Sequence, residues 1–196
     1  MLSLATRAWI PFFLTALRAA LAPIVLILAL LAPSRSAFGC CLVAAFLSDV
    51  FDGIVARRLG VATPSLRRFD SLADSLFYAA AAFAVWHLHA PAIVERRLPL
   101  LVLVALELGR YAFDFAKFKR EASYHMWSSK LWGIALFAGF FSLLALGSDN
   151  VLVDAAVYIG IVADLEGLTI STLLPDWRSD VPSVIHAVRL RARARA

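Results

Sequence analysis

The sequence predicts an all-α, polytopic membrane protein with about six transmembrane helices and both termini in the cytoplasm. Of its 196 residues, 62% are hydrophobic and only 17% are charged. A soluble globular domain is nearer half apolar and a quarter charged. The mean hydropathy is +0.81, and each membrane crossing needs roughly 20 apolar residues. The chain therefore has room for about six crossings within one membrane domain.

Six apolar segments separated by turn residues support this fold class. They are predicted at about 10–31, 36–58, 69–90, 98–118, 128–146 and 151–174. Pro33, Pro91, Gly147 and Pro175 mark the ends of segments, as proline and glycine do in helix–loop patterns. The first segment is long and is interrupted by Arg18, so we expect a transmembrane helix there and not a cleaved signal peptide.

The distribution of Lys and Arg predicts the orientation. The termini and the connections after the second and fourth segments carry most of the basic residues, namely Arg7, Arg57, Arg58, Arg67, Arg68, Lys117, Lys119, Arg120, Arg178 and the arginines of the tail. The opposite connections carry Arg35, Arg96 and Arg97. Basic loops face the cytoplasm, so both termini are expected there. Residues 1–178 are predicted to form the six-helix transmembrane domain, and residues 179–196 a basic cytoplasmic tail.

The basic character of the chain has two other interpretations. The pI of about 9.7 fits a nucleic-acid-binding protein, but no segment resembles an RNA- or DNA-binding module, so no nucleic-acid partner is expected. The arginines of the tail either touch anionic lipid head groups or lie in solvent.

Four aspartates are the most informative polar residues. Asp49 and Asp52 lie near the cytoplasmic end of the second segment, and Asp70 and Asp74 near the cytoplasmic start of the third. Spacings of three and four place each pair on one helix face. Carboxylates that converge in a low-dielectric site take up protons or bind cations. Their hard oxygen ligands favour Mg²⁺ or Mn²⁺, and two such ions can neutralise a diphosphate.

Two neighbours of the aspartates suit a phosphate ligand. Gly53 lets a ligand approach the helix backbone closely, and Arg57 is placed to bind phosphate oxygens. In the alternative interpretation, the aspartates form structural ion pairs with nearby arginines, namely Arg57, Arg58, Arg67 and Arg68.

Further polar residues fall in the inner halves of the other segments, namely Thr15, Arg18, Arg110, Asp114, Lys130, Asp164 and Glu166. Charged side chains inside a membrane span are costly and mark function or a paired structural role. Because the outer halves are almost uncharged, we expect one polar cavity that opens to the cytoplasm.

The stretch from Asp49 to Asp74 resembles the signature of the CDP-alcohol phosphotransferases, D-x2-D-G-x2-A-R-x8-G-x3-D-x3-D. Every position matches in type and spacing except the second glycine, which is Leu66 here. A weaker match lies in the first segment, where Pro11, Thr15, Arg18 and Pro23 resemble the stretch P-N-x2-T-x2-R-x4-P of bacterial members. Phe12 stands in place of the asparagine.

The resemblance implies roles for these residues. Asp49, Asp52, Asp70 and Asp74 would bind two Mg²⁺ or Mn²⁺ ions, and Asp74 would also be the catalytic base. The cytidine nucleotide would be bound by residues of both motifs, namely Gly53, Ala56, Arg57 and Thr15.

The resemblance also implies an enzyme of phospholipid biosynthesis. It would transfer a phosphatidyl group from a CDP-linked lipid, CDP-diacylglycerol, to a small alcohol, and it would release CMP. The enzyme would be a homodimer in the bacterial inner membrane, with its active site facing the cytoplasm.

The acceptor alcohol is less clear from the sequence. Arg110 and Lys130 lie within or at the edge of segments and could bind the phosphate of glycerol 3-phosphate or inositol phosphate. Alternatively, Arg110 pairs with Asp114, four residues away. Asp164 and Glu166 either counter Arg110 or line the cavity.

Three other functions compete with this one. An aspartate-rich prenyltransferase also binds diphosphate through Mg²⁺, but its acidic clusters lack this pattern of glycine and arginine. A cation transporter would need polar residues through the full membrane depth. An inactive relative that binds nucleotide or partners is suggested by Leu66 and Phe12.

Overall fold

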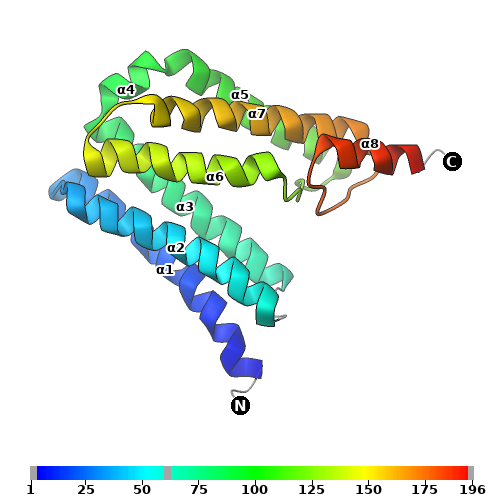
Figure 1. Ribbon diagram of the computed structural model, residues 1–196, viewed down its shortest axis with the longest axis horizontal. Coiled ribbons are helices and arrows are strands. Elements are labelled where there is room, and N and C mark those ends of the chain that lie inside the picture. The colour runs from blue at the N-terminus through cyan, green and yellow to red at the C-terminus, as the bar shows by residue number, and fades with distance from the viewer. Residues whose placement is uncertain (1–3, 60–62, 194–196) are drawn as a thin grey trace. The chain divides into compact units, whose positions relative to one another are not determined.

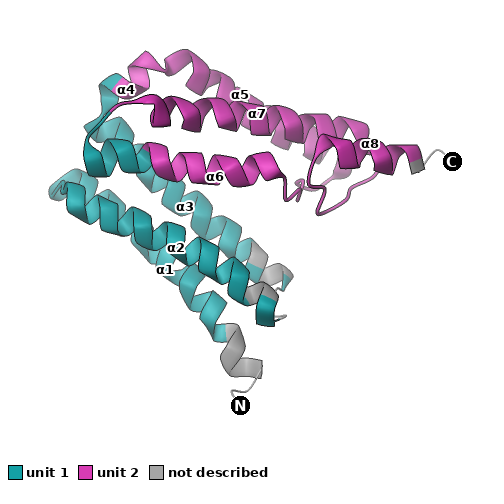
Figure 2. Cartoon of the chain, in the orientation of Figure 1, with its two compact units in different colours: residues 1–91, 140–148 teal, residues 92–139, 149–196 magenta. Residues whose placement is uncertain are grey.

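The computed structural model, which describes residues 4–59 and 63–193, consists of helices and their connections (Figure 1). Within these ranges no strand occurs, and one isolated bridge pairs Ser123 with Ser179. The predicted all-α class is therefore confirmed. The chain divides into two compact units, residues 1–91 with 140–148 and residues 92–139 with 149–196 (Figure 2).

Unit 1 is a bundle built around the first helix. Its elements are α1 (Leu4–Leu31), α2 (Arg35–Leu59), α3 (Pro64–Leu88) and the π-helix η1 (Phe141–Leu146). Helix α1 packs against both α2 and α3, and η1 packs against α2. Many of the buried residues are small, among them Ala29, Ala45, Ala73, Ala81 and Ala84. Small side chains let helix backbones approach closely, which brings the polar faces of α1, α2 and α3 together.

Unit 2 contains the remaining helices, except for residues 90–91 at the start of α4 and Phe140 at the end of α6, which belong to unit 1. They are α4 (Ala90–Glu95), α5 (Arg97–Phe118), α6 (Trp127–Phe140), α7 (Val151–Leu173) and α8 (Val184–Arg193), and η1 continues α6 directly. Helix α7 packs against α5 and α8. A separate apolar cluster joins three parts of unit 2: the end of α7, the connection that precedes α6, and α8 with the residues just before it. Its buried members are Tyr124, Met126, Ile170, Leu174, Val181 and Ala187.

The predicted segments correspond to α1, α2, α3, α5, α6 with η1, and α7, but the start of α3 was predicted wrongly. Residues 64–68 begin α3 and do not form a loop. Thr63 caps the helix, since its side chain accepts a hydrogen bond from the Leu66 N–H (3.2 Å), and Pro64 occupies the first position, which favours proline. The short helices α4 and α8 were not predicted.

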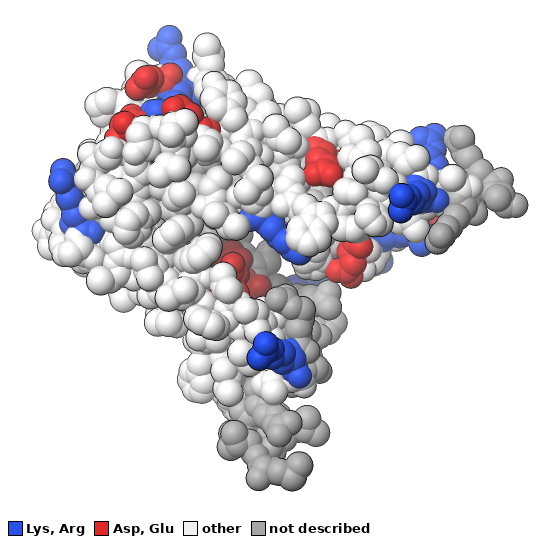
Figure 3. Space-filling view, in the orientation of Figure 1, with Lys and Arg blue, Asp and Glu red and all other residues white. Residues whose placement is uncertain are grey.

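Three of the described helical stretches are long and apolar enough to cross a membrane: Trp9–Leu31, Arg35–Val55 and Trp127–Leu146. The crossings expected at α3, α5 and α7, and the cytoplasmic placement of both termini, remain predictions. Exposed apolar side chains along α5 and α7, such as Leu98, Leu101, Val151 and Val162, suit a lipid environment. The face in Figure 3 is largely uncharged, with charged atoms in small separate groups.

Glycine allows the closest helix contacts in unit 2. A Cβ atom at Gly160 would lie 2.6 Å from Trp132 Nε1 and 2.9 Å from Leu103 Cδ1. The Trp132 Nε1–H is itself fixed by donating to the Ala156 carbonyl at 3.0 Å. The indole therefore has little freedom to move away from a larger residue.

We expect Gly160→Ala to lower the free energy of unfolding by roughly 1–3 kcal/mol, as overpacking does. A Cβ at Gly109 meets no atom within 4 Å, so Gly109→Ala is the matched control. Thermal unfolding of both variants in detergent tests this expectation, and equal melting temperatures would contradict it.

Candidate metal centre

The four aspartates gather in unit 1 around the guanidinium group of Arg18. Helix α1 supplies Arg18, α2 supplies Asp49 and Asp52, and α3 supplies Asp70 and Asp74. Nη1 of Arg18 lies 3.3 Å from Asp49 Oδ1 and 3.1 Å from Asp70 Oδ1, and it also donates to Asp74 Oδ1. Nη2 donates to Asp52 Oδ2 at 2.5 Å. One arginine thus binds all four carboxylates of the predicted motif.

The cluster is buried on one side and open on the other. The side chains of Arg18 and Asp52 are 2% and 7% exposed. Those of Asp49, Asp70 and Asp74 are 48%, 36% and 33% exposed. Ions and ligands can therefore reach three of the carboxylates, while Arg18 and Asp52 form the buried base of the site.

Two hydroxyl groups support this base. Thr15 Oγ1 lies 3.1 Å from the Pro11 carbonyl and 3.4 Å from Asp52 Oδ2, and its single proton serves one of these acceptors at a time. Ser48 Oγ donates to the Ala45 carbonyl at 2.7 Å and accepts from Arg18 Nε at 3.5 Å. Thr15 therefore lies beside Asp52, and its role as a nucleotide contact stays a prediction.

The carboxylates fit a divalent cation. One oxygen from each of Asp49, Asp70 and Asp74 lies within 4.8 Å of the others. Oxygen ligands at 2.0–2.1 Å from one Mg²⁺ are about 3–4 Å apart, so small side-chain movements would complete the geometry. A single guanidinium opposes four carboxylates, which leaves excess negative charge for further cations. Nη1 of Arg18 contacts one oxygen of each of the same three aspartates, so a metal ion held by all three would compete with it for these carboxylates.

The structure describes the side-chain environment of some of the other motif residues but not of all. Gly53 lies on α2 one residue after Asp52 and is partly buried. The side chains of Ala56 and Arg57 lie outside the part of the chain that the structure describes. Leu66, which replaces the family's glycine, is partly buried in the first turn of α3. Phe12, which replaces the asparagine, stacks on Phe69 with ring centroids 5.3 Å apart.

The aspartates do form ion pairs, as the alternative interpretation predicted, but with a different arginine. The partner is Arg18 of α1, whereas Arg58 and Arg68, the two predicted partners whose side chains the structure describes, are exposed. The sequence contained a signal for Arg18, since Thr15 and Arg18 are three residues apart in an apolar helix and so share one face. Its contact with all four aspartates was not foreseen.

The predicted acceptor residues lie in unit 2, where no described contact joins them. Nη2 of Arg110 contacts Glu107 Oε1 at 3.0 Å, and Nε lies 3.2 Å from Asp164 Oδ1. The ammonium of Lys130 lies 4.4 Å from the centre of the Trp127 ring. Asp164 therefore does counter Arg110, as one alternative proposed, and Glu107 was missed as a second partner.

Asp114 does not pair with Arg110, so that alternative was wrong. Asp114 Oδ1 accepts from Ser171 Oγ at 2.5 Å, and Tyr124 Oη lies 3.1 Å from the same Ser171 oxygen. Burial raises the pKa of the Tyr124 phenol, so the phenol keeps its proton and donates to Ser171. Glu166 does not contact Arg110 in the described set; its Oε1 accepts from the Val184 N–H at 3.2 Å.

Comparison with known proteins agrees with the motif. The sequence model of the CDP-alcohol phosphatidyltransferase family matches residues 8–165. This range includes the helix α1 motif, all four aspartates, Arg110 and Lys130. No curated protein and no solved structure matches the chain.

Proposed function

Because the chain belongs to the CDP-alcohol phosphatidyltransferase family, we propose that it transfers a phosphatidyl group from CDP-diacylglycerol to a small alcohol and releases CMP. The gathering of Asp49, Asp52, Asp70 and Asp74 in one partly open site supports this proposal most directly.

The four aspartates are proposed to hold two Mg²⁺ or Mn²⁺ ions. When bound, these ions neutralise the diphosphate of the donor and the charge on departing CMP. Asp74, which is one-third exposed, takes the proton of the acceptor hydroxyl as general base. The acceptor oxygen then forms a bond to the phosphorus that carries the lipid, and the bond from that phosphorus to the CMP oxygen breaks.

The nucleotide is proposed to lie beside α1 and α2. Gly53 permits close approach to the α2 backbone, and Arg57 is the expected phosphate ligand, with Ala56 beside it. Thr15 is the fourth proposed contact. Its Oγ1 lies 3.4 Å from Asp52 Oδ2, so a nucleotide bound by Thr15 would lie next to the proposed metal site.

Arg110 and Lys130 are the proposed acceptor contacts. Arg110 already pairs with Glu107 and Asp164, so a phosphorylated acceptor must compete with two carboxylates for it. Lys130 is exposed, and its ammonium lies over the Trp127 ring with no carboxylate partner among the described residues, so it is the more available cation. Glycerol 3-phosphate and inositol phosphate remain the proposed acceptors, and a homodimer the proposed assembly.

Product analysis tests this function. Purified protein in lipid nanodiscs would receive CDP-diacylglycerol, Mn²⁺ and one alcohol at a time, with mass spectrometry of the lipid products. We expect one acceptor to yield a new phospholipid together with an equal amount of CMP. No product from any acceptor, with CDP-diacylglycerol binding intact, would instead indicate a relative that binds the nucleotide without transfer.

A substitution of Leu66 tests whether this side chain crowds the bound nucleotide. If its side chain crowds the nucleotide, Leu66→Gly should bind CDP-diacylglycerol more tightly, because glycine restores the family's open backbone at that position. Titration of both proteins by fluorescence or calorimetry measures this difference. Much weaker binding by the variant would contradict crowding and would assign Leu66 a supporting role at the start of α3.

A further inference from the structure

Helix α8 is fixed to the rest of unit 2 by one face and by its first turn. Ala187 is fully buried in the apolar cluster that includes Met126 and Ile170. The Val184 N–H donates to Glu166 Oε1 at 3.2 Å, where a carboxylate also favours the helix N-terminus. Just before α8, the Pro182 carbonyl accepts from the Trp127 N–H at 3.3 Å. These contacts determine which side chains α8 presents outward.

A second apolar stripe runs along the outward side of α8. Ile185 and Val188 are 63% and 50% exposed, and Ala192 is also exposed. Their spacing of three and four places them on one side of the helix. This side differs from the packed face, to which Ala187 and the partly buried Val184 and Leu190 belong. The helix therefore has more apolar surface than its contacts within unit 2 cover.

A basic face borders this stripe. Arg189 is exposed and lies one helical turn after Ile185, and His186 is exposed beside it. No acidic residue occurs from Val181 to the end of the sequence, whereas arginine occurs at positions 189, 191, 193 and 195. Figure 3 shows basic atoms over α8. The surface is thus complementary to an anionic partner that also offers an apolar layer.

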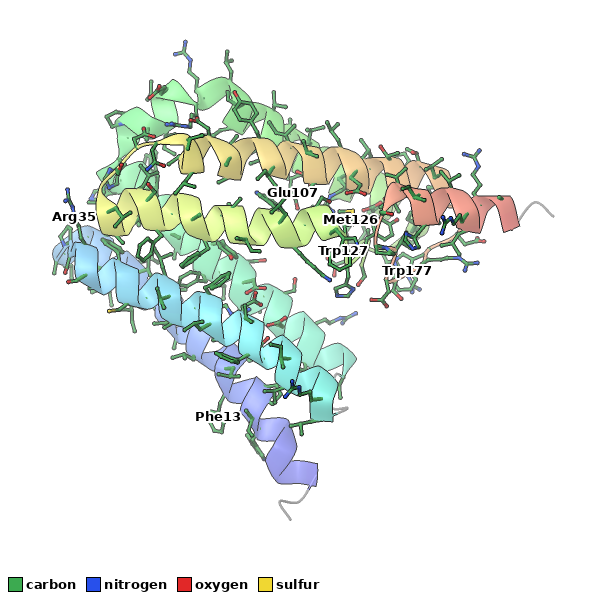
Figure 4. The ribbon with its side chains drawn as sticks, in the orientation of Figure 1. Phe13, Arg35, Glu107, Met126, Trp127 and Trp177 are labelled. Atoms are coloured by element: carbon green, nitrogen blue, oxygen red, sulfur yellow. The ribbon has the colours of Figure 1, made fainter. Side chains whose placement is uncertain are left out.

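Aromatic and basic side chains mark the same end of unit 2. The ring of Trp127 is 67% exposed, with the Lys130 ammonium 4.4 Å from its centre. The Arg120 guanidinium carbon lies 4.8 Å from the centre of the Trp177 ring. Figure 4 places Trp127 and Trp177 at the end of the unit where α8 lies. Tryptophan with Lys or Arg is typical of the depth at which lipid head groups meet the hydrocarbon.

We propose that α8 is an interfacial helix that binds the anionic phospholipid surface of the membrane. Ile185, Val188 and Ala192 enter the boundary between head groups and acyl chains, and Arg189 with its neighbours binds lipid phosphates, as in other basic amphipathic helices. A second protein copy fits this surface poorly, because three side chains fall far short of the roughly 800 Å² per partner of a stable interface. The proposal does not depend on the catalytic activity.

Site-specific fluorescence in nanodiscs holding one protein chain tests this proposal. In a background where Cys40 and Cys41 are replaced by alanine, Ile185→Cys carries an environment-sensitive dye, and His186→Cys is the matched control on the polar face. We expect quenching of the Ile185 dye by lipids brominated in the acyl chain and quenching of the His186 dye by aqueous iodide. Equal access of iodide to both dyes would overturn the proposal.

Changing the lipid composition tests whether α8 recognises anionic head groups. Adding phosphatidylglycerol to phosphatidylcholine nanodiscs should increase lipid quenching of the Ile185 dye severalfold, and the double substitution Arg189→Gln and Arg191→Gln should remove most of that increase. Quenching that is independent of phosphatidylglycerol would overturn anionic recognition. A dye shielded from both iodide and brominated lipid would show that protein covers the stripe, which also overturns the proposal.

Discussion

Asp74→Asn is expected to lower CMP release by about 10²–10⁴-fold, the usual contribution of a general base. Asparagine keeps the shape of the side chain but cannot accept the proton of the acceptor hydroxyl. It also weakens one of the contacts of Nη1 of Arg18, so folding must be verified by thermal unfolding. Rates of CMP release from CDP-diacylglycerol at saturating Mn²⁺ provide the measurement.

A carboxylate outside the cluster serves as the control for Asp74. Asp154 pairs with Arg96 at 2.7 Å, in unit 2, and Asp154→Asn removes a carboxylate of the same type. We expect this control to retain the parent rate within about threefold, since no proton transfer is assigned to it. An Asp74→Asn rate that equals that of the control would exclude Asp74 as the base.

Arg18→Met is expected to destabilise the metal-free protein severely. Arg18 is almost fully buried among four carboxylates, and breaking a buried ion pair by removing one partner costs about 3–5 kcal/mol. Mg²⁺ should restore more stability to this variant than to the parent, because the ion no longer competes with Nη1 for the carboxylates. Melting temperatures in detergent, with EDTA and with Mg²⁺, measure both effects.

Arg18→Lys separates charge from geometry in this experiment. Lysine retains one positive charge but cannot bind four carboxylates through a planar guanidinium, so an intermediate loss of stability is expected in EDTA. If Mg²⁺ raised the melting temperature of the parent and of Arg18→Met equally, Arg18 and the ion would not share a position. The interpretation of the cluster as a metal centre shielded by Arg18 would then be wrong.

The sequence was sufficient to predict the six long helical segments and the shared face of each aspartate pair, because both follow from local patterns. Long apolar runs define α1, α2 and α7. The spacings of Asp49 with Asp52 and of Asp70 with Asp74 place each pair on one helix face. These signals depend only on helix periodicity, so tertiary packing does not alter them.

Features that depend on packing between helices were missed. Arg18 contacts aspartates 31–56 positions away in the chain, and Arg110 selects Glu107 and Asp164 over Asp114. Such choices depend on helix rotation, which composition does not specify. Helix α8 was missed because its short basic sequence resembles a solvated tail, whereas Ala187 and Glu166 attach it to unit 2.

The early start of α3 was missed for another reason: a local signal was present but was interpreted wrongly. Thr63 followed by Pro64 is typical of a helix N-terminus. The basic residues after Pro64 favoured a loop instead, so Leu66 was placed outside the helix to which it belongs.

Metal-dependent release of CMP from CDP-diacylglycerol by the purified protein tests the proposed role of the aspartate cluster most directly. The parent and Asp70→Asn would be compared across a Mg²⁺ titration, each with the acceptor identified by product analysis. We expect CMP release from the parent that requires Mg²⁺ and stops with EDTA, together with a variant that is inactive or needs far more Mg²⁺. Equal release by both proteins, or release that persists in EDTA, would contradict a catalytic metal centre at these aspartates.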